Sequence, residues 1–142
     1  MVQKQYRFKS WDGFIQIVLK KGSPARSESF SLRTLPAAHP FIQSRFKKLV
    51  NTRPKLNSKM ALAPKFAVVV SKKVSKSAVV RNRIRRRTFE WIRLHLGELN
   101  QDQLTMVFVH TDAVAKIPSK ELDSQLTNLF QKAKLINSVA KN

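Results

Sequence analysis

The stretch FAVVVSKKVSKSAVVRNRIRRR, at residues 66–87, says more about the fold of this chain than any other. It opens on an apolar run rich in valine, which predicts a buried strand over residues 65–71. A short basic link follows, and apolar residues then recur at helical spacing, which predicts a helix over residues 77–96 that Gly97 ends. A strand that leads directly into an amphipathic helix is typical of a small α/β layer.

Downstream of this unit the sequence supplies a second strand and a closing helix. The apolar run LTMVFVH predicts a strand over residues 104–110. A last helix begins after Pro118, with Ser119 as its cap and with acidic residues in its first turns, where they suit the helix dipole. Its predicted buried stripe comprises Leu122, Leu126, Leu129, Phe130 and Ala133.

Upstream, the pattern predicts a short helix, a turn and a strand. Apolar residues at helical spacing place the helix over residues 10–22, capped by Ser10. The sequence GSPARS, at residues 22–27, predicts a turn, and alternation over residues 28–35 predicts a half-buried strand. We therefore expect a single α/β domain over residues 1–142, in which helices pack on one sheet.

Residues 36–64 have a different composition. Four prolines and six Lys or Arg side chains punctuate the segment. We interpret it as a loosely ordered, basic insertion within the domain, and a short helix around residues 41–50 is the alternative. On this interpretation, replacing the segment by a short linker leaves the domain folded.

Charge is the dominant feature of the composition. The 142 residues include 28 Lys or Arg and 8 Asp or Glu, for a formal net charge of +20. A domain this basic repels itself unless it meets a polyanion. The phosphate backbone of a nucleic acid is the commonest such partner, and an anionic membrane surface is the second candidate.

Cysteine and long apolar runs are both missing from the sequence. The lack of cysteine excludes disulfides, thiol nucleophiles and cysteine-based zinc sites. No apolar run approaches the roughly 20 residues of a membrane span. The first residues also lack the apolar core of a signal peptide, so we expect a cytoplasmic protein.

The basic link and the start of the helix that follows it carry the functional signal. Between residues 72 and 87 the chain has eight Lys or Arg and no acid. Arginine, which predominates, suits bidentate phosphate recognition, and the helix start adds free N–H donors. Asn82 stands inside the arginine run, where its amide can both donate to and accept from a sugar, a base edge or a water. A solvated basic helix, or an unspecific polyanion patch, is the plainer alternative.

The same stretch resembles the signature of the bacterial ribonuclease P protein family. That signature is a strand, then SKK, a short variable link and A-V-x-R-N-R-I-[KR]-R, which here begins at Ser71 and resumes at Ala78. The resemblance covers about residues 6–35 and 65–136 but not the segment between them. The other similar segments are YRFKSWDGFIQIVLKKG, FSLRTL, LTMVFVH and ELDSQLTNLFQKAKL.

This resemblance implies a fold and a function. The fold is a two-layer α+β sandwich of order αβββαβα, with an unusual left-handed βαβ crossover, like domain 2 of ribosomal protein S5. The function is that of a subunit of ribonuclease P, an endoribonuclease in which a catalytic RNA with Mg²⁺ removes the 5′ leader of precursor tRNA. The implied partners are the catalytic RNA and precursor tRNA. No protein or membrane partner, no catalytic residue and no metal site in the protein are expected.

The resemblance also assigns roles to residues. Those expected to face the catalytic RNA are Lys72, Lys73, Lys76, Arg81, Asn82, Arg83, Arg85, Arg86 and Arg87. Those expected in a cleft between the first helix and the sheet, which holds the single-stranded leader, are Phe14, Ile15, Leu19, Phe30 and Arg33. Many members have aromatic residues at the positions of Leu19 and Arg33. Less base stacking and more phosphate pairing are therefore expected here.

The remaining residues do not indicate catalysis by the protein itself. A two-metal nuclease needs clustered carboxylates, and the eight acids are scattered along the chain. The histidines His39, His95 and His110 lie far apart, and His95 falls on an apolar helix face, which favours packing. Two other functions stay open: a structural rRNA-binding protein without a role in cleavage, and a basic binder of DNA or membrane surfaces. The spacing between SKK and RNR disfavours the first. The second would need neither Asn82 in register nor a strand before the basic patch.

Overall fold

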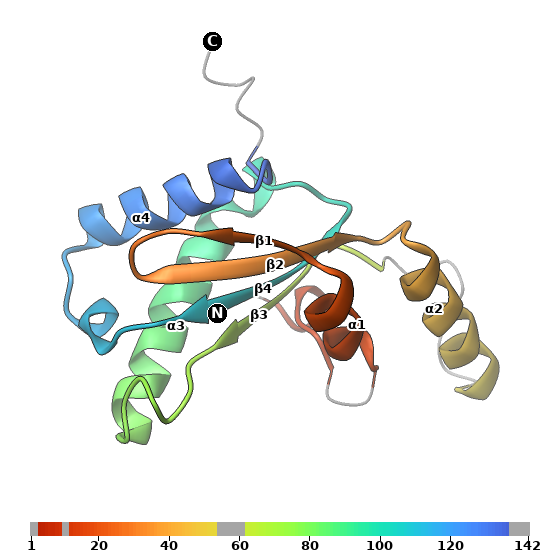
Figure 1. Ribbon diagram of the computed structural model, residues 1–142, viewed down its shortest axis with the longest axis horizontal. Coiled ribbons are helices and arrows are strands. Elements are labelled where there is room, and N and C mark those ends of the chain that lie inside the picture. The colour runs from red at the N-terminus through yellow and green to blue at the C-terminus, as the bar shows by residue number, and fades with distance from the viewer. Residues whose placement is uncertain (1–2, 10–11, 54–61, 137–142) are drawn as a thin grey trace, which may run out of the picture.

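The strand–helix–strand unit forms as predicted. The computed structural model describes residues 3–9, 12–53 and 62–136. In it, β3 (Lys65–Val69) leads through the basic link into α3 (Ala78–His95), and β4 (Gln103–Val109) returns parallel to β3 (Figure 1). The hydroxyl of Ser77 caps α3 by accepting a 3.3 Å hydrogen bond from the backbone N–H of Val80, as its place before the helix predicts.

Two further strands extend the sheet beyond β4. β1 (Ser23–Arg26) pairs antiparallel with β2 (Phe30–Pro36), and β2 pairs antiparallel with β4, for a strand order of β1-β2-β4-β3. This four-stranded sheet with its helices confirms the predicted α/β fold class. The elements follow the order αβββαβα with one added helix, α2 (Pro40–Thr52). The hand of the crossover through α3 stays a prediction.

The predicted turn over residues 22–27 is wrong, because β1 occupies most of it. The side chains of β1 are exposed or half-buried, as suits the edge of a sheet. An edge strand without a buried face shows no hydrophobic alternation, so the pattern that reveals a strand is missing. Pro24 is tolerated because an edge strand can leave the N–H side of a residue unpaired.

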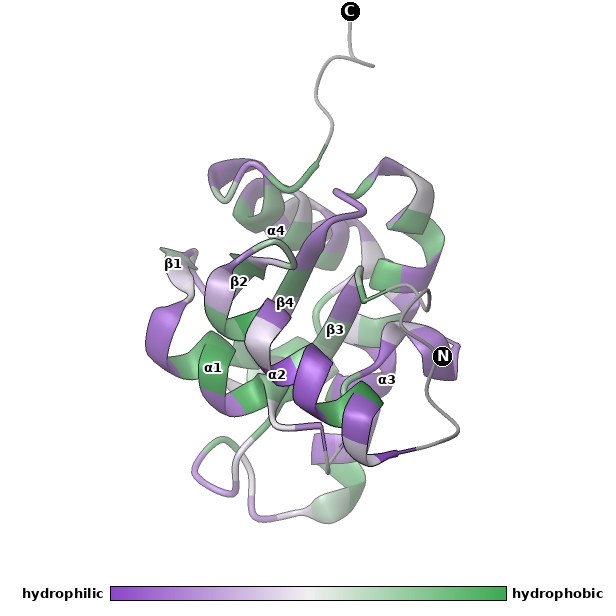
Figure 2. Ribbon diagram, turned by 90° about the vertical axis from the view of Figure 1, so that its right-hand side faces the viewer, coloured by the Kyte–Doolittle hydropathy of each residue, from purple (hydrophilic) through white to green (hydrophobic). Residues whose placement is uncertain are grey.

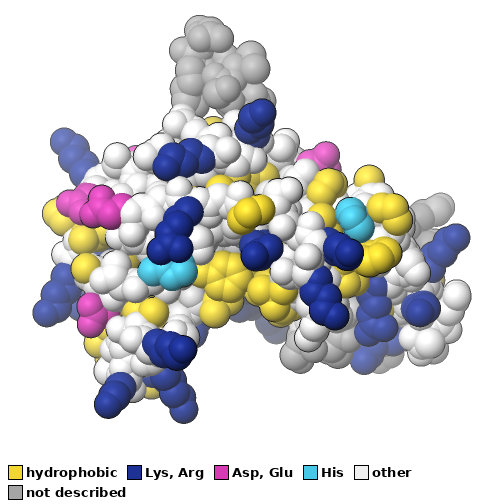
Figure 3. Space-filling view, viewed as in Figure 1, with side chains coloured by type: hydrophobic (Ala, Val, Ile, Leu, Met, Phe, Trp, Pro, Cys, Tyr) yellow, Lys and Arg dark blue, Asp and Glu magenta, His cyan; other side chains and the backbone are white. Residues whose placement is uncertain are grey.

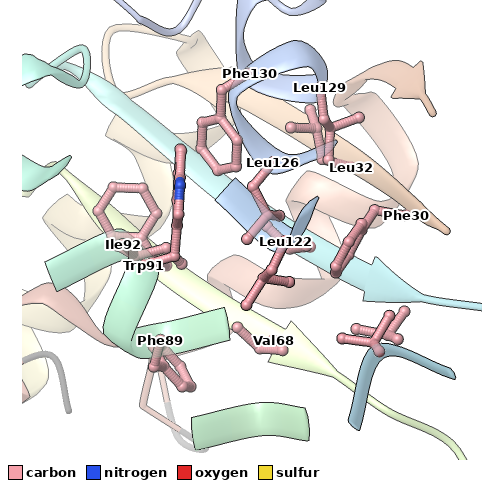
Figure 4. Close-up of a cluster of buried hydrophobic side chains, with 14 of the residues drawn as sticks. Phe30, Leu32, Val68, Phe89, Trp91, Ile92, Leu122, Leu126, Leu129 and Phe130 are labelled. Atoms are coloured by element: carbon pink, nitrogen blue, oxygen red, sulfur yellow. The ribbon is translucent and has the colours of Figure 1, made fainter. Parts of the chain in front are cut away.

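α3 and α4 (Ser119–Lys132) cover one face of the sheet. Figure 4 shows the leucines of α4 packed toward Phe30 and Leu32 of β2, within a cluster that also takes Trp91 from α3. The predicted stripe of α4 is confirmed, since its leucines and Phe130 are buried and Ala133 is half-buried. Burial of this apolar surface is the main term that stabilises the two layers.

α1 (Phe14–Lys21) packs on the opposite face, so helices cover both sides of the sheet. α2 lies beside α1 and joins the same hydrophobic cluster. Both helices are amphipathic, and Figure 2 shows hydrophobic and hydrophilic residues mixed along them. The buried members of this second cluster are Phe14, Val18, Leu35, Ile42, Leu49, Leu104 and Met106.

α1 begins later than the sequence pattern predicts. The carboxylate of Asp12 accepts hydrogen bonds from the backbone N–H of Phe14, at 2.9 Å, and of Lys9, at 2.8 Å. Gly13, between Asp12 and Phe14, has a φ of 77°. Glycine adopts this left-handed conformation without strain. The side chain of Asp12 therefore bonds the first free N–H of the helix, the role that we predicted for Ser10. Ser10 lies outside the described residues.

The expectation of a loosely ordered segment at residues 36–64 is wrong for α2. Ile42 and Leu49 are buried in the second cluster, and α2 contacts α1. The guanidinium of Arg45 donates a 2.8 Å hydrogen bond from Nε to the carbonyl oxygen of Asp12, which ties α2 to the start of α1. A short linker in place of this segment would remove these contacts, so we no longer expect the shortened domain to be as stable. Residues 54–61 lie outside the described part of the chain.

α4 begins after Pro118 without a side-chain cap, so Ser119 is its first residue and not its cap. Three short 3-10 helices complete the chain: η1 (Lys4–Tyr6), η2 (Leu96–Glu98) and η3 (Asp112–Ala115). Within the residues described, no helix combines the length and the apolar character needed to cross a membrane.

Candidate RNA-binding surface

The basic link and the start of α3 form a projecting unit, residues 71–86, which we call the basic tip. In Figure 1 the link and the first turns of α3 extend beyond the end of the sheet. Val79 is 74% exposed there, whereas Ile84, one and a half turns later, is fully buried. Only the later turns of α3 therefore dock on the sheet.

Short hydrogen bonds hold the backbone of the tip in place. The backbone N–H of Val74 donates to the carbonyl oxygen of Ser71 at 3.0 Å and closes a turn around the two lysines. The guanidinium of Arg81 donates to the carbonyl oxygen of Ser75 at 2.9 Å, so this arginine braces the link against the helix. Part of its donor capacity is thus used within the protein.

Two other residues of the family signature, Asn82 and Arg85, form a hydrogen bond with each other. Arg85 donates a 2.7 Å hydrogen bond from Nη1 to the side-chain oxygen of Asn82. This bond occupies the acceptor of the Asn82 amide and leaves its two N–H donors free, because an amide offers one carbonyl and one NH₂ group. Asn82, which is exposed, therefore presents donors outward, as recognition of a phosphate or sugar oxygen requires.

The remaining cations of the tip have no partner within the described residues. They are exposed and make no hydrogen bond or ion pair with that part of the chain: Lys72, Lys73, Lys76, Arg83 and Arg86. Five unpaired like charges on one projecting unit repel one another at short range. A polyanion would relieve that repulsion, and the release of its counterions would favour binding. Their contact with RNA stays a prediction.

Arg87, the ninth residue assigned to RNA, is placed differently. Its guanidinium donates hydrogen bonds of 2.6 Å to the carbonyl oxygens of Val114 and Ile117, in and beside η3. Desolvation by burial, together with the nearby charge of Arg83, lowers the pKa of Arg87. The donors are thus turned into the protein, and the assignment of Arg87 to the RNA-facing set is corrected: its position is that of a structural tie.

A groove of about 690 Å³ runs beside Arg83 and Arg86, between α3 and the start of α4. Asp123 in this groove accepts a 2.8 Å hydrogen bond from Trp91 Nε1 and lies 3.3 Å from Nε2 of His95. The ring of His95 stacks on Trp91 with centroids 4.2 Å apart, so His95 packs against the helix face as predicted. One oxygen of the Asp123 carboxylate, Oδ1, therefore contacts both internal partners.

On the other side of the sheet, two rows of side chains extend past α1. Strand pairing aligns them across all four strands on the face that carries α1, and we call them the open face. The row nearer to α1 is Pro24, Arg33, Met106 and Ala67, and the outer row is Arg26, Ser31, Phe108 and Val69. Figure 3 shows this side of the molecule as a shallow recess in which hydrophobic side chains lie among Lys and Arg.

Of the residues predicted to line the leader cleft, Arg33 belongs to the open face, and Ile15 and Leu19 belong to α1. Leu19 is 41% exposed, Ile15 is half-buried, and half-buried Arg33 donates to the carbonyl oxygen of Gly22 at 3.2 Å. Phe14, the first residue of α1, is buried and packs in the second cluster.

The assignment of Phe30 to the cleft is wrong. Its side chain is fully buried on the opposite face, under α4 (Figure 4). Successive residues of a strand point to opposite faces, so the open face receives Ser31 and Arg33 from β2, and Phe30 and Leu32 point away from it.

Sequence reasoning missed three residues of the outer row and its margin: Ser31, Phe108 and His110. All three lie on the same side, because Phe108 and His110 are two residues apart at the end of β4 and Ser31 is the register partner of Phe108. The alternation of β4 contained a signal. Its apolar run places a large aromatic on the face that α1 covers only in part, and a histidine follows the strand.

A protein-bound metal ion needs several ligating side chains close together. Over residues 3–9, 12–53 and 62–136, no three or more His, Cys, Asp or Glu side chains come together in a way that could hold a metal ion.

Comparison with known sequences points to one family. The profile of the family described as Ribonuclease P matches residues 2–134, and the match runs through the α2 segment. A protein named Ribonuclease P protein component from Pseudanabaena sp. is 40% identical over 73 residues, which cover 51% of this chain and 62% of that protein. Its namesake from Clostridium botulinum is 38% identical over 73 residues, which cover 51% of this chain and 65% of that protein. These matches span less than two thirds of either relative.

Solved structures agree with the fold. The RNase P protein of Staphylococcus aureus has a TM-score of 0.65 and 20% identity, over 93% of this chain and 98% of that chain. The RNase P protein of Thermotoga maritima has a TM-score of 0.63 and 16% identity, over 89% of this chain and 96% of that chain. At this level of identity the likeness concerns the arrangement of helices and strands.

Proposed function

The chain belongs to the ribonuclease P protein family, and from that premise we propose that it is the protein subunit of a ribonuclease P ribonucleoprotein. In this role it binds the catalytic RNA and the 5′ leader of precursor tRNA. It thereby supports the endonucleolytic removal of the leader that gives a mature 5′ end. The proposal includes a cytoplasmic location, which the protein would share with its substrate.

The observation that carries the proposal is the basic tip. Five cations without a partner in the described part of the chain stand on a link and a helix start that internal hydrogen bonds hold in a fixed shape. A fixed array of charges loses little conformational entropy when it meets a phosphate backbone, and it favours a partner whose phosphates match its spacing. A flexible basic tail, in contrast, would bind any polyanion.

The open face supplies the second half of the proposal. It offers half-buried apolar side chains beside Arg26 and Arg33, on a surface only partly covered by a helix. Single-stranded RNA is bound through stacking of its bases on aromatic rings and through pairing of its phosphates with cations, without a duplex to read. A single-stranded leader fits this chemistry.

Catalysis is assigned to the RNA partner, with Mg²⁺ held by that RNA. The described protein residues offer no ligand set for the metal. The contribution of this chain is then to bind and orient RNA. Orientation alone can supply a large part of a rate enhancement, because it removes the entropic cost of bringing the reacting groups together.

A binding experiment tests the proposal. The affinity of the catalytic RNA would be measured for precursor tRNA with its leader and for the same tRNA lacking the leader. Each measurement would be made with this protein present and with it absent. We expect the protein to tighten binding of the leader-bearing substrate selectively. Equal tightening of both substrates would point instead to a structural RNA-binding protein.

A further inference from the structure

We propose that Ser31, Phe108 and His110 form a subsite for one nucleobase of the single-stranded RNA bound on the open face. The inference deepens the proposed function and rests on it. It concerns a position at which strands β2 and β4 place a hydroxyl, an aromatic ring and an imidazole side by side.

His110 is held in place by one contact of its imidazole and one of its backbone. Its Nε2 lies 2.7 Å from the hydroxyl oxygen of Ser31, across 79 residues of sequence. Its backbone N–H donates a 2.9 Å hydrogen bond to the carbonyl oxygen of Ser29, which continues the ladder between β2 and β4 beyond the last strand pair. The side chain of His110 is nevertheless exposed, so a ligand in solution can reach it.

The pair has the hydrogen-bonding capacity of a base reader. If Nε2 of neutral His110 carries the proton and donates to Ser31, then Nδ1 is an acceptor and the hydroxyl is a donor. If Nδ1 carries the proton, it is the donor and the hydroxyl oxygen is the acceptor. In both tautomers the pair offers one donor and one acceptor to a ligand. Every nucleobase carries such a combination on its Watson–Crick edge, whereas a phosphate offers acceptors only.

Phe108 provides a stacking surface beside this pair. It is the register partner of Ser31 and is half-buried, so part of its ring is open to solvent while the rest is fixed against the second cluster. Val69 extends the apolar surface on one side, and the exposed Arg26 completes the row on the other. A base stacked on the ring would leave its phosphate within the reach of cations.

The position in the fold connects the subsite with the basic tip. β3 and β4 are parallel and Val69 pairs with Phe108, so both strands end at the same edge of the sheet. The basic tip begins at Ser71, immediately after β3. RNA held at the tip therefore lies next to the outer row of the open face.

A catalytic role for the pair does not follow from this geometry. A hydroxyl nucleophile needs a base that a third group orients, usually a carboxylate. Among the described residues no carboxylate is hydrogen-bonded to His110, and its known contacts are those to β2. Recognition is the chemistry that the site can perform.

Abasic scanning of the leader in the assembled ribonucleoprotein tests the inference. The affinity for precursor tRNA would be measured with each leader nucleotide in turn lacking its base, for the wild type and for His110→Ala, Ser31→Ala and Phe108→Leu. Asn128→Ala, an exposed position on α4, is the matched control. We expect one leader position at which base removal weakens wild-type binding about 3- to 10-fold, the range for one or two hydrogen bonds lost. At that position base removal should weaken binding less in His110→Ala and Ser31→Ala than in the wild type, because only stacking on Phe108 is then left to lose.

The outcomes are distinct. If the wild type prefers leader-bearing RNA but all variants keep the same abasic profile, the subsite is refuted and the proposed function stands. If the wild type shows no leader preference, both fall. Because His110 is exposed, its replacement should leave the unfolding temperature unchanged. Phe108→Leu, which keeps an apolar side chain, separates the loss of stacking from the loss of packing.

Discussion

Nη1 of Arg87 donates a 2.6 Å hydrogen bond to the carbonyl oxygen of Val114, and so ties the middle of α3 to η3. A second bond, from Nη2 to the carbonyl oxygen of Ile117, makes the tie bidentate. Arg86, the preceding residue, points to solvent and has no partner within the described residues. Two neighbouring arginines of one basic run therefore have different physical roles.

Replacing Arg87 should affect stability. Arg87→Ala leaves two carbonyl oxygens without their donor, and a hydrogen bond to a charged group contributes about 1.5–3 kcal/mol. We expect the free energy of unfolding to fall by about 2–4 kcal/mol, measured by denaturant titration. Arg86→Ala is the control and should change it by less than about 0.5 kcal/mol. Equal stabilities for the two variants would show that the tie is not formed in solution.

Replacing Arg86 should affect RNA affinity. We expect Arg86→Ala to weaken assembly with the catalytic RNA and to lower the slope of log K against log salt concentration by about 1, the change for one lost phosphate contact. Salt titration of the assembly equilibrium measures this slope, with Asn128→Ala as a surface control. An unchanged slope would remove Arg86 from the RNA-facing surface.

α2 should be an integral part of the domain. Ile42 is fully buried in the second cluster, so Ile42→Ala removes buried methyl groups and leaves a cavity. Such replacements cost about 2–5 kcal/mol, and we expect a loss in this range in thermal or denaturant unfolding. Ser44→Ala, an exposed position two residues further along α2, serves as the control. A loss below about 1 kcal/mol for Ile42→Ala would favour the loose insertion that the composition first suggested.

Gly13 should tolerate substitution poorly. A Cβ at this position would lie 2.7 Å from Nε of Arg45, and the φ of 77° disfavours any side chain. The left-handed conformation alone costs about 1–2 kcal/mol, so we expect Gly13→Ala to destabilise by at least that amount. Gly97→Ala, where a Cβ meets nothing within 4 Å, should be neutral in the same unfolding assay. Similar effects of the two substitutions would contradict the described start of α1.

Glu90 and Arg93 form an ion pair that lowers the pKa of the Glu90 carboxyl. The guanidinium of Arg93 donates to both carboxylate oxygens of Glu90, at 2.6 and 3.0 Å, and these bonds hold the pKa of Glu90 below its ordinary value. A lowered pKa in the folded state stabilises the fold above the ordinary pKa, and this contribution is lost as pH falls through the lowered value.

An NMR titration of the Glu90 carboxyl tests this pair. We expect its pKa to rise in Arg93→Gln toward the value of an unpaired glutamate. Because the pair is exposed, the effect on overall stability should be small. A pKa of Glu90 that does not change in Arg93→Gln would show that the pair does not persist in solution.

Some elements could be read from the sequence because their pattern is local. α3 and α4 each bury a stripe at helical spacing, and β3 and β4 are continuous apolar runs, so local patterns find them. β1 and the start of α1 could not be found in this way. β1 is defined by pairing with β2 and buries no stripe, and α1 begins where Asp12 and Gly13 permit.

The candidate site was predictable as a basic surface but not residue by residue. Charge and spacing identify the basic tip, whereas the direction of each guanidinium depends on tertiary partners. Arg87 turns inward because η3 brings carbonyl oxygens to it, and nothing in the local sequence reports that. Phe30 was misassigned because its neighbours in the motif lie on the opposite face of β2. The pairing of Ser31 with His110 joins residues too distant in the chain for any local pattern.

Cleavage of precursor tRNA by the cognate catalytic RNA, at low Mg²⁺ and with or without this protein, tests the central claim most directly. The account predicts that the protein stimulates cleavage, that the products have correct mature 5′ ends, and that the protein alone cuts nothing. Absence of stimulation under conditions in which the protein demonstrably binds the catalytic RNA would contradict it.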